Sequence, residues 1–404
     1  MTFCRCSMSS EELEMRSILI LSGSPKEVID GVRYYASVNG VQGFLTAKTL
    51  ALKGNQVTVI MPDDESYEDC ENLRIITKKS DGTVIVSAED MVKAASEVCA
   101  ENKFDLAIQL ANTASFKAHK PVSQKLKVKD NDLVSFEIEK NTDLFLHLQS
   151  LGLPVIEEPD ELNEKPVLKS PAREPKTKEL IGIKVIVSSG AVSEILTAKN
   201  DVITNFSSGK QGFEIAYALA DRGADVLLIA GNVHLPEPSH THIKTIYVQS
   251  TEEMLKACQK GLPAHAYIGV AAVADFGIKT VINNIEEYFA SDRVRTIEMK
   301  QNPDILSYFG HLKETRPEIV IGFAAETHDL LSYAEQKLHK KNADVIFANS
   351  VSKDNNAMGS DNNRVYMITK NKTVDCGYSS KYRVGEIIAE IISSNPKLFP
   401  ALQK

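Results

Sequence analysis

The chain has 404 residues, more than one hydrophobic core usually serves, so two domains are expected. A hydrophobic fraction of 43% with a net charge of −8 is typical of a globular protein and argues against nucleic-acid binding. Six scattered cysteines without zinc-type spacing indicate a reducing compartment. The sequence shows no signal peptide or membrane span, so the expectation is a cytoplasmic protein without membrane contacts.

The first of two similar patterns covers residues 17–152. SILILSGS, at 17–24, is a short apolar run ending in small residues, which predicts a buried strand. A loop and the predicted helix GFLTAKTLALKG follow, and QVTVIMP is then a second strand. A strand, a helix and a strand in this order predict a parallel pair joined by a crossover.

A proline-rich segment divides the chain. Residues 154–175 hold five of the fifteen prolines and many charges, a composition typical of an exposed linker. The predicted organisation is a flexible tail over 1–16, an α/β domain over 17–152, a linker over 153–180, a second α/β domain over 181–396 and a tail over 397–404.

The second domain repeats the first and extends it. The opening strand and helix recur as IKVIVSSG and GFEIAYALADRG. Two later segments of the first domain also recur: FDLAIQLANTASF corresponds to AYIGVAAVADF, and EIEKNTDLF corresponds to EMKQNPDIL. The segment that begins IVIGFAAET adds a strand, a helix and a strand that the first domain lacks. The sequence therefore predicts an internal duplication of two Rossmann-like α/β domains with mostly parallel sheets.

The loop NFSSGKQGF, from Asn205 to Phe213, precedes a predicted helix but contains neither GxGxxG nor a P-loop. Free N–H groups and the helix dipole favour an anion there, and Ser207, Ser208 and Lys210 add donors. The same residues also suit an ordinary capped start of a helix, so both interpretations stand at this point.

Polar residues also follow other strands of the second domain. Asp275 ends AAVAD, Asp304 lies in NPDIL and Glu326 lies in GFAAET, and the carboxyl ends of parallel strands are where open α/β sheets bind ligands. Lys337 and Lys341 are four residues apart on one face of a predicted helix, where they can reach a polyphosphate or simply face solvent.

The motifs of the second domain occur in the order NFSSGKQGF, AAVAD, NPDIL, GFAAET, KLHKK and GSDNN. Through them, residues 181–396 resemble bacterial phosphopantothenate–cysteine ligase of coenzyme A biosynthesis. The resemblance implies a CTP- and Mg²⁺-dependent enzyme that converts 4′-phosphopantothenate to an acyl-cytidylate and then joins it to L-cysteine. It implies that Asn205 serves turnover of the acyl-cytidylate, and it names no protein ligands for a metal. The implied nucleotide contacts are Gly269, Val270, Ala271, Asp275, Pro303, Asp304, Ile305, Leu306, Phe323, Lys337 and Lys341.

The second domain departs from that family at two places. IEEY, residues 285–288, stands where the family has a Lys-x-Lys-Lys loop, and Asp201 stands where it has an arginine. The first domain, which resembles the same family over 17–152, supplies both features as Arg33 and as Lys125 with its neighbouring lysines. It lacks the asparagine, the aspartate and the GFAAET segment.

Each domain thus keeps what the other has lost, which predicts a covalent pseudo-dimer, compatible with a monomeric chain, with one composite site. Lys125 is expected to close over bound CTP. The phosphate of phosphopantothenate is expected to bind at Ser207, Ser208, Gly209 and Arg33. Use of CTP over ATP, no flavin and a separate decarboxylase are also expected. Two alternatives stay open: a nucleotide-binding homologue without catalysis, and an NAD(P)-dependent oxidoreductase, which the missing GxGxxG disfavours.

Overall fold

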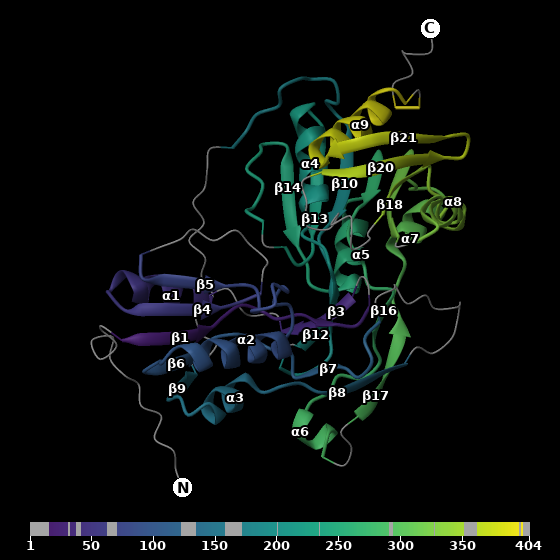
Figure 1. Ribbon diagram of the computed structural model, residues 1–404. Coiled ribbons are helices and arrows are strands. Elements are labelled where there is room, and N and C mark those ends of the chain that lie inside the picture. Colours follow the sequence, from purple (N-terminus) through teal and green to yellow (C-terminus); the bar gives the residue numbers. More distant parts are fainter. Residues whose placement is uncertain are drawn as a thin grey trace.

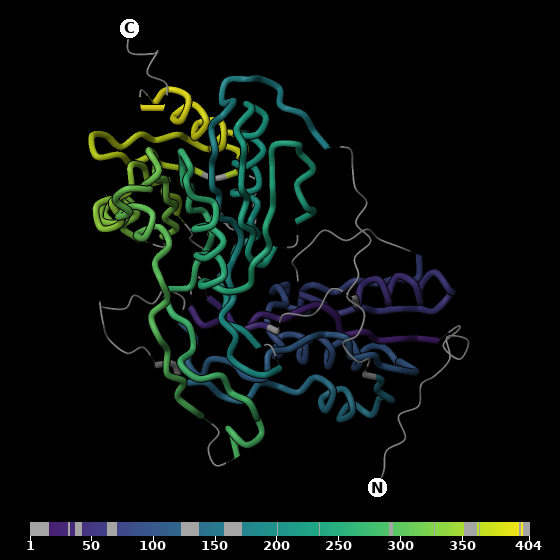
Figure 2. Tube along the Cα trace, turned by 180° about the vertical axis from the view of Figure 1, so that it is seen from behind, coloured from purple at the N-terminus to yellow at the C-terminus, as the bar shows by residue number. Residues whose placement is uncertain are grey.

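The computed structural model shows two lobes, the first domain below and the second above in Figure 1. Seen from behind in Figure 2, the green part of the second lobe around residues 276–301 runs down along the first lobe. The structure describes residues 16–30, 33–37, 42–62, 71–122, 135–157, 172–199, 201–233, 235–290, 294–326, 328–350, 362–395 and 397–398. The predicted tails and the middle of the predicted linker lie almost wholly outside these residues.

The first lobe is built on a five-stranded parallel sheet in the order β5-β4-β1-β6-β9. Helix α1 packs on one face, and α2 and α3 pack on the other. The strands are β1 (Ser17–Leu21), β4 (Gln56–Ile60), β5 (Leu73–Ile76), β6 (Leu106–Gln109) and β9 (Val155–Glu157), and the helices are α1 (Gln42–Leu52), α2 (Ala88–Glu101) and α3 (Leu144–Ser150).

The second lobe repeats this order as β14-β13-β10-β15-β18 and continues with β19, β20 and β21. The last two strands pair antiparallel, whereas the others are parallel, so the predicted α/β class with mostly parallel sheets is confirmed. The strands are β10 (Lys184–Ser189), β13 (Asp225–Ala230), β14 (Ile243–Tyr247), β15 (Ala266–Gly269), β18 (Ile319–Glu326), β19 (Val345–Ser350), β20 (Asn362–Thr369) and β21 (Thr373–Ser380).

Helices cover both faces of the second sheet. One face carries α4 (Lys210–Asp221) and α9 (Lys381–Ser393), and the other carries α5 (Thr251–Lys260), α7 (Ile305–His311) and α8 (Leu330–Lys340). Equivalent helices of the two lobes begin alike, because α2 and α5 both start with a capping box, at Ser87 and Ser250. Helices α3 and α7 are both N-capped by an aspartate, Asp143 and Asp304.

Two four-stranded sheets join the lobes, in the orders β11-β12-β3-β2 and β16-β17-β8-β7. In each, a hairpin of the first lobe pairs antiparallel with the equivalent hairpin of the second, at β3–β12 and at β8–β17. The elements are β2 (Glu27–Val28), β3 (Arg33–Ser37), β7 (Phe116–Ala118), β8 (Ser135–Lys140), β11 (Ser193–Ile195), β12 (Asp201–Asn205), β16 (Phe276–Ile278), β17 (Val294–Gln301) and the short helix α6 (Ile285–Tyr288).

An apolar core lies between these two shared sheets. It draws Tyr35, Phe116 and Ile138 from the first lobe and Ile203 and Ile297 from the second, all of them buried. Tyr35 and Ile203 are Cα partners at the centre of β3–β12, and the Tyr35 ring packs edge-on against Phe116 at 5.1 Å between centroids. The two lobes thus share this apolar core, in addition to the cores that each lobe forms from its own residues.

The ends of the predicted linker belong to the lobes. Strand β9 lies beyond the predicted boundary at 152 and takes the place in the first sheet that β18 has in the second. The first domain therefore keeps a short counterpart of the strand that its sequence seemed to lack. On the other side, the backbone N–H groups of Lys176 and Thr177 donate to the carbonyl of Asp221 on the second lobe. No helix in the described part of the chain is long and apolar enough to cross a bilayer.

Candidate functional site

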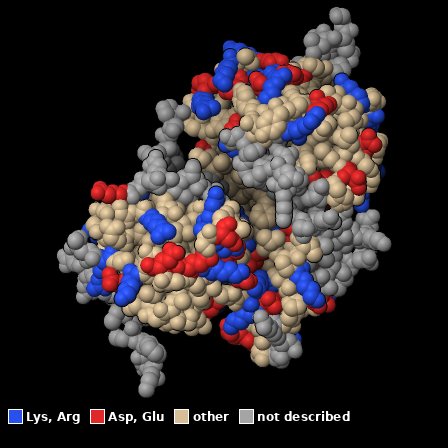
Figure 3. Space-filling view, viewed as in Figure 1, with Lys and Arg blue, Asp and Glu red and all other residues tan. Residues whose placement is uncertain are grey.

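The space-filling view is hollowed between the two lobes (Figure 3). Asn205 is the last residue of β12, one of the strands that join the lobes, and it is 8% exposed. Its Nδ2 donates a hydrogen bond of 3.0 Å to the carbonyl of Ala272. Asn205 is therefore held against the AAVAD loop that follows β15.

Arg33 of the first lobe lies opposite Asn205, as its Cα partner in the antiparallel β3–β12 pair. The structure thus brings together the two residues that the sequence predicted to come from different halves. The Arg33 side chain is largely buried and forms an ion pair with Asp30, with 2.6 Å between Nη2 and Oδ2. A role of Arg33 in binding phosphate stays a prediction.

The residue after Asn205 is also in contact with the first lobe. Phe206 packs on Tyr34 with 4.4 Å between ring centroids, and the Lys26 ammonium lies 5.5 Å from the Tyr34 centroid and 5.9 Å from that of Phe206. Lys26 and Tyr34 could not be predicted here from the sequence, because only the register between the lobes places them beside this loop. A second cation of the first lobe thus stands beside the Asn205 loop.

Gly209 fixes the start of α4 against the end of β10. Its φ of +76° disfavours other residues, and a Cβ there would lie 2.4 Å from Val233. Ser189 Oγ donates to the Gly209 carbonyl at 2.7 Å. Gly209 is itself the N-cap and provides no side-chain cap, so Ser-Ser-Gly forms the N-cap turn of α4, and an anion site at this turn stays a prediction.

The two serines before α4 make only long contacts with its first turn. Ser207 Oγ accepts from the N–H of Gly209, and Ser208 Oγ accepts from the N–H of Lys210, each at 3.4 Å. These N–H groups are therefore weakly satisfied, which suits an anion at the positive end of the helix dipole.

The predicted nucleotide residues after β15 form one loop at the carboxyl edge of the sheet. Gly269 ends the strand, and the backbone N–H groups of Val270 and Ala272 donate to the carbonyls of Ser188 on β10 and of Gly190 just after it. These contacts hold Ala271 between them. Asp275 at the end of the loop has an exposed side chain.

The NPDIL turn lies beside that loop, because the N–H of Asn302 donates to the carbonyl of Asp275 at 2.9 Å. Pro303 and Asp304 are exposed, and Asp304 caps α7. Ile305 is only 3% exposed and belongs to the core, so its backbone is what can meet a ligand. Leu306 packs on Gly322 of β18, because a Cβ added to Gly322 would lie 2.4 Å from Leu306 Cδ2.

Phe323, Lys337 and Lys341 lie at the same edge of the sheet. The Phe323 ring stacks on Phe347 at 5.4 Å between centroids, and its carbonyl accepts from Lys337 Nζ at 2.7 Å. Lys341 forms an ion pair with Asp304. The two lysines thus bind predicted nucleotide residues, which gathers the set around one place and leaves both ammonium groups with protein partners.

The segment IEEY forms α6 at the junction of the lobes. Ile285 is buried in the shared core, and Glu286 forms an exposed ion pair of 2.8 Å with Lys140 of the first lobe, which lowers the pKa of Glu286. The segment therefore serves contact between the lobes. Lys125 falls between Val122 and Ser135, outside the described residues, and so do Lys127 and Lys129.

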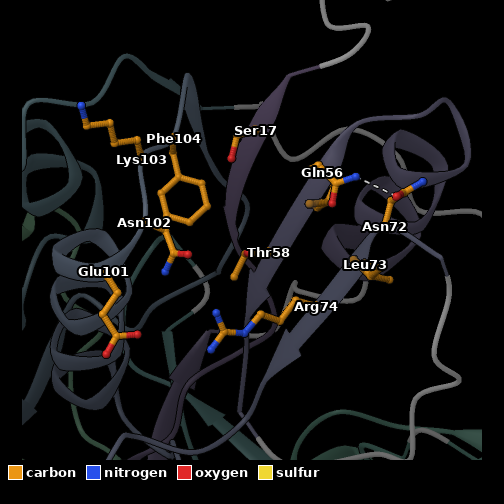
Figure 4. A pocket seen from close by; sticks show the side chains of 11 residues that line it. Ser17, Gln56, Thr58, Asn72, Leu73, Arg74, Glu101, Asn102, Lys103 and Phe104 are labelled. Carbon is orange, nitrogen blue, oxygen red and sulfur yellow. Dashed lines mark hydrogen bonds between the residues drawn. The ribbon is translucent and has the colours of Figure 1, made fainter.

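One cavity is at the opposite edge of the first sheet, away from the carboxyl ends of its strands (Figure 4). It has about 600 Å³ and lies at the amino ends of β1, β4 and β5 beside Glu101 and Phe104, with a hydrogen bond between Gln56 and Asn72 on its wall. An equivalent cavity of about 260 Å³ lies at the amino ends of β10, β13 and β14. Because both lobes have it, we attribute this hollow to the fold and assign it no ligand.

No cluster of three His, Cys, Asp or Glu side chains that could hold a metal occurs among the described residues. The residues present nevertheless fit Mg²⁺ carried by a nucleotide, because Mg²⁺ bound to phosphates usually needs only one or two carboxylates from the protein. Asp275 is one carboxylate exposed at the predicted nucleotide loop.

The chain is similar to curated proteins over about half of their length. It is 39% identical over 216 residues to coenzyme A biosynthesis bifunctional protein CoaBC of Vibrio cholerae, which covers 53% of each protein. It is 38% identical over 192 residues to CoaBC of Bacillus subtilis, which covers 47% of this chain and 46% of that one. A crystal structure of the C-terminal domain of CoaBC matches with 30% identity and a TM-score of 0.44, covering 54% of this chain and 97% of that domain.

A family model described as the DNA/pantothenate metabolism flavoprotein C-terminal domain matches residues 13–153 and 180–395. These two stretches make up most of the 404 residues and follow the two lobes. The chain therefore belongs to the family of the DNA/pantothenate metabolism flavoprotein C-terminal domain.

Proposed function

We propose that the chain is a CTP-dependent phosphopantothenate–cysteine ligase with one composite active site between its lobes. The observation that carries the proposal is the place of Asn205. It faces Arg33 across β3–β12 and is hydrogen-bonded to Ala272 in the loop that holds the proposed nucleotide contacts. Asn205 therefore stands between the proposed phosphopantothenate and nucleotide positions, where the acyl carbon must lie. The similarity to part of the CoaBC proteins supports a role in coenzyme A biosynthesis.

The reaction has two steps. A carboxylate oxygen of 4′-phosphopantothenate attacks the α-phosphorus of CTP, and the bond to the β-phosphate breaks and releases pyrophosphate. The amine of cysteine then attacks the acyl carbon, CMP leaves with the electron pair of the acyl–oxygen bond, and the amine loses a proton as the amide forms. The first step is needed because a carboxylate becomes a good electrophile only when its oxygen is part of a good leaving group.

Asn205 serves the second step. Its Nδ2 has two N–H donors, of which one is directed at Ala272. The other donor can bind the acyl oxygen as negative charge develops there, and a donor fixed in advance is worth more than one that must reorient.

The lysines and Mg²⁺ serve the first step. Lys337 and Lys341 lie beside Phe323 and Asp304, so their ammonium groups can exchange these partners for phosphate oxygens. Asp275 would hold Mg²⁺ carried by the nucleotide, and the ion would supply further positive charge to the phosphates. Lys125 of the first lobe adds a cation that IEEY cannot give.

The substrate phosphate is proposed to bind at the start of α4. Donors for it are the weakly satisfied N–H groups of Gly209 and Lys210 and the hydroxyl groups of Ser207 and Ser208. Arg33 lies on the neighbouring strand. Arg33 can share its guanidinium between Asp30 and a phosphate, because it has five N–H donors.

A nucleotide-binding protein without catalysis is the second candidate, favoured by IEEY, which forms α6 where the related ligases have their lysine loop. Pyrophosphate release decides between them, measured with CTP or ATP, 4′-phosphopantothenate, cysteine and Mg²⁺, with mass spectrometry of the product. We expect release with CTP that depends on phosphopantothenate, and a product with the mass of phosphopantothenoylcysteine. Equal use of ATP would refute only the CTP preference, whereas no release with either nucleotide would refute the ligase.

A further inference from the structure

We propose, resting on the ligase function above, that Glu194 is a positioning residue which holds the two nucleotide loops together through Asn302. Glu194 is on β11 and is not one of the proposed nucleotide or phosphopantothenate contacts. Its Oε1 accepts from Thr251 Oγ1 at 2.6 Å, from Asn302 Nδ2 at 2.8 Å and from the Thr251 N–H at 3.3 Å. Thr251 is the first residue of α5, where the helix dipole stabilises a carboxylate.

Asn302 connects the two loops directly. Its backbone N–H donates to the carbonyl of Asp275, and its Nδ2 donates to that of Ala274 at 3.0 Å. One residue of the NPDIL turn thus fixes the end of the AAVAD loop. Because Glu194 binds the same Nδ2, the carboxylate sets the rotamer in which Asn302 makes these bonds.

The space at this point is closed tightly. A Cβ on Gly277 of β16 would lie 2.8 Å from both Asn302 Oδ1 and Glu194 Oε2. The two side chains therefore occupy the place that a side chain at position 277 would take.

The first lobe contains the same arrangement without the proposed nucleotide site. Glu27 Oε1 accepts from the N–H of Ala88, the first residue of α2, at 2.8 Å and from Asn141 Nδ2 at 3.0 Å. Asn141 Nδ2 also donates to the carbonyl of Ala114, and the Asn141 N–H donates to that of Ser115. A purely structural role would make the two networks equivalent, so the first lobe offers a matched control.

The test compares Glu194→Ala with Glu27→Ala in the full-length chain. In Glu194→Ala we expect the KM for CTP to rise about tenfold with little change in kcat, the size expected for losing hydrogen bonds to a charged group. Glu194→Gln keeps an acceptor oxygen and should recover most of this loss. Glu27→Ala should lower the melting temperature and leave the KM for CTP unchanged.

Hydrogen exchange gives a second readout that does not depend on activity. Glu194→Ala should speed amide exchange in 270–276 and 302–306, and Glu27→Ala should do so only in 111–116 and 141–145. An equal rise of KM in both variants, or unchanged exchange in 270–276, would overturn the positioning role. If the wild-type chain releases no pyrophosphate, the proposed function fails, and exchange alone decides whether Glu194 holds these loops.

Discussion

Arg33 and Asn205 are Cα partners across β3–β12, and the pseudo-symmetric pair in the same ladder is Ser37 with Asp201. The second pair is built differently, because Asp201 is 1% exposed and its Oδ1 accepts from the N–H of Ser115 while Oδ2 accepts from Thr197 Oγ1. A carboxylate thus fills the place that Arg33 has in the first pair. The ladder is therefore symmetric in backbone and asymmetric in chemistry, which supports one site per chain.

Replacing Asn205 should separate the two steps of the reaction. In Asn205→Ala we expect pyrophosphate release to continue and the acyl-cytidylate to accumulate, because the lost amide serves attack by the amine and not binding of the triphosphate. Mass spectrometry of the quenched reaction detects the intermediate. A variant that releases no pyrophosphate would show that Asn205 acts earlier.

Replacing Arg33 should raise the KM for phosphopantothenate and leave the KM for CTP unchanged. Arg33→Ala alone would leave the buried carboxylate of Asp30 without its ion pair, at a cost of about 3–5 kcal/mol in stability. We therefore suggest Arg33→Met combined with Asp30→Asn, with Asp30→Asn alone as the control. We expect the double variant to raise the KM for phosphopantothenate by about tenfold or more, the effect of losing a charge-assisted contact. A change in the KM for CTP alone would reassign Arg33 to packing between the lobes.

His240 should make the stability of the second lobe depend on pH. Its side chain is fully buried, with 3.5 Å between Nε2 and Oδ1 of Asp221. Burial lowers the pKa of His240. The folded protein then binds this proton less tightly than the unfolded chain, so stability is greatest above the ordinary histidine pKa of ~6.5 and falls as the pH drops through it.

Melting temperatures measured from about pH 7.5 to about pH 5.5, on either side of that pKa, test this. The slope should flatten in His240→Asn and stay as in the wild type in His311→Asn, which removes an exposed histidine. An unchanged slope in His240→Asn would show that other groups cause the dependence.

The repeated strand–helix–strand units could be predicted because they depend on local patterns. The apolar run of β1, the helical spacing in α4 and the positive φ of Gly223 after that helix all follow from neighbouring residues. The shared sheets could not be predicted, since β2, β7, β11 and β16 have only two or three residues and pair according to how the lobes dock.

In the site, too, local motifs could be predicted from the sequence, whereas contacts that depend on tertiary structure could not. Motif order predicted that Asn205, Asp275, Asp304 and the two lysines belong together, but it gave no sign that Lys341 pairs with Asp304. It also could not place Lys26 beside Phe206, because that contact depends on the register of β3 against β12. Glu194 was missed because its role depends on Asn302, which is 108 residues away.

Single-turnover pyrophosphate release by Lys125→Ala tests most directly the claim that the first lobe completes a site in the second. Lys140→Ala is the matched control, because it removes a first-lobe lysine whose partner is the exposed Glu286. We predict that Lys125→Ala lowers the rate with CTP by a factor on the order of 10²–10³, the loss typical of one transition-state contact, while Lys140→Ala keeps the wild-type rate. A wild-type rate in Lys125→Ala would contradict the composite site at this residue.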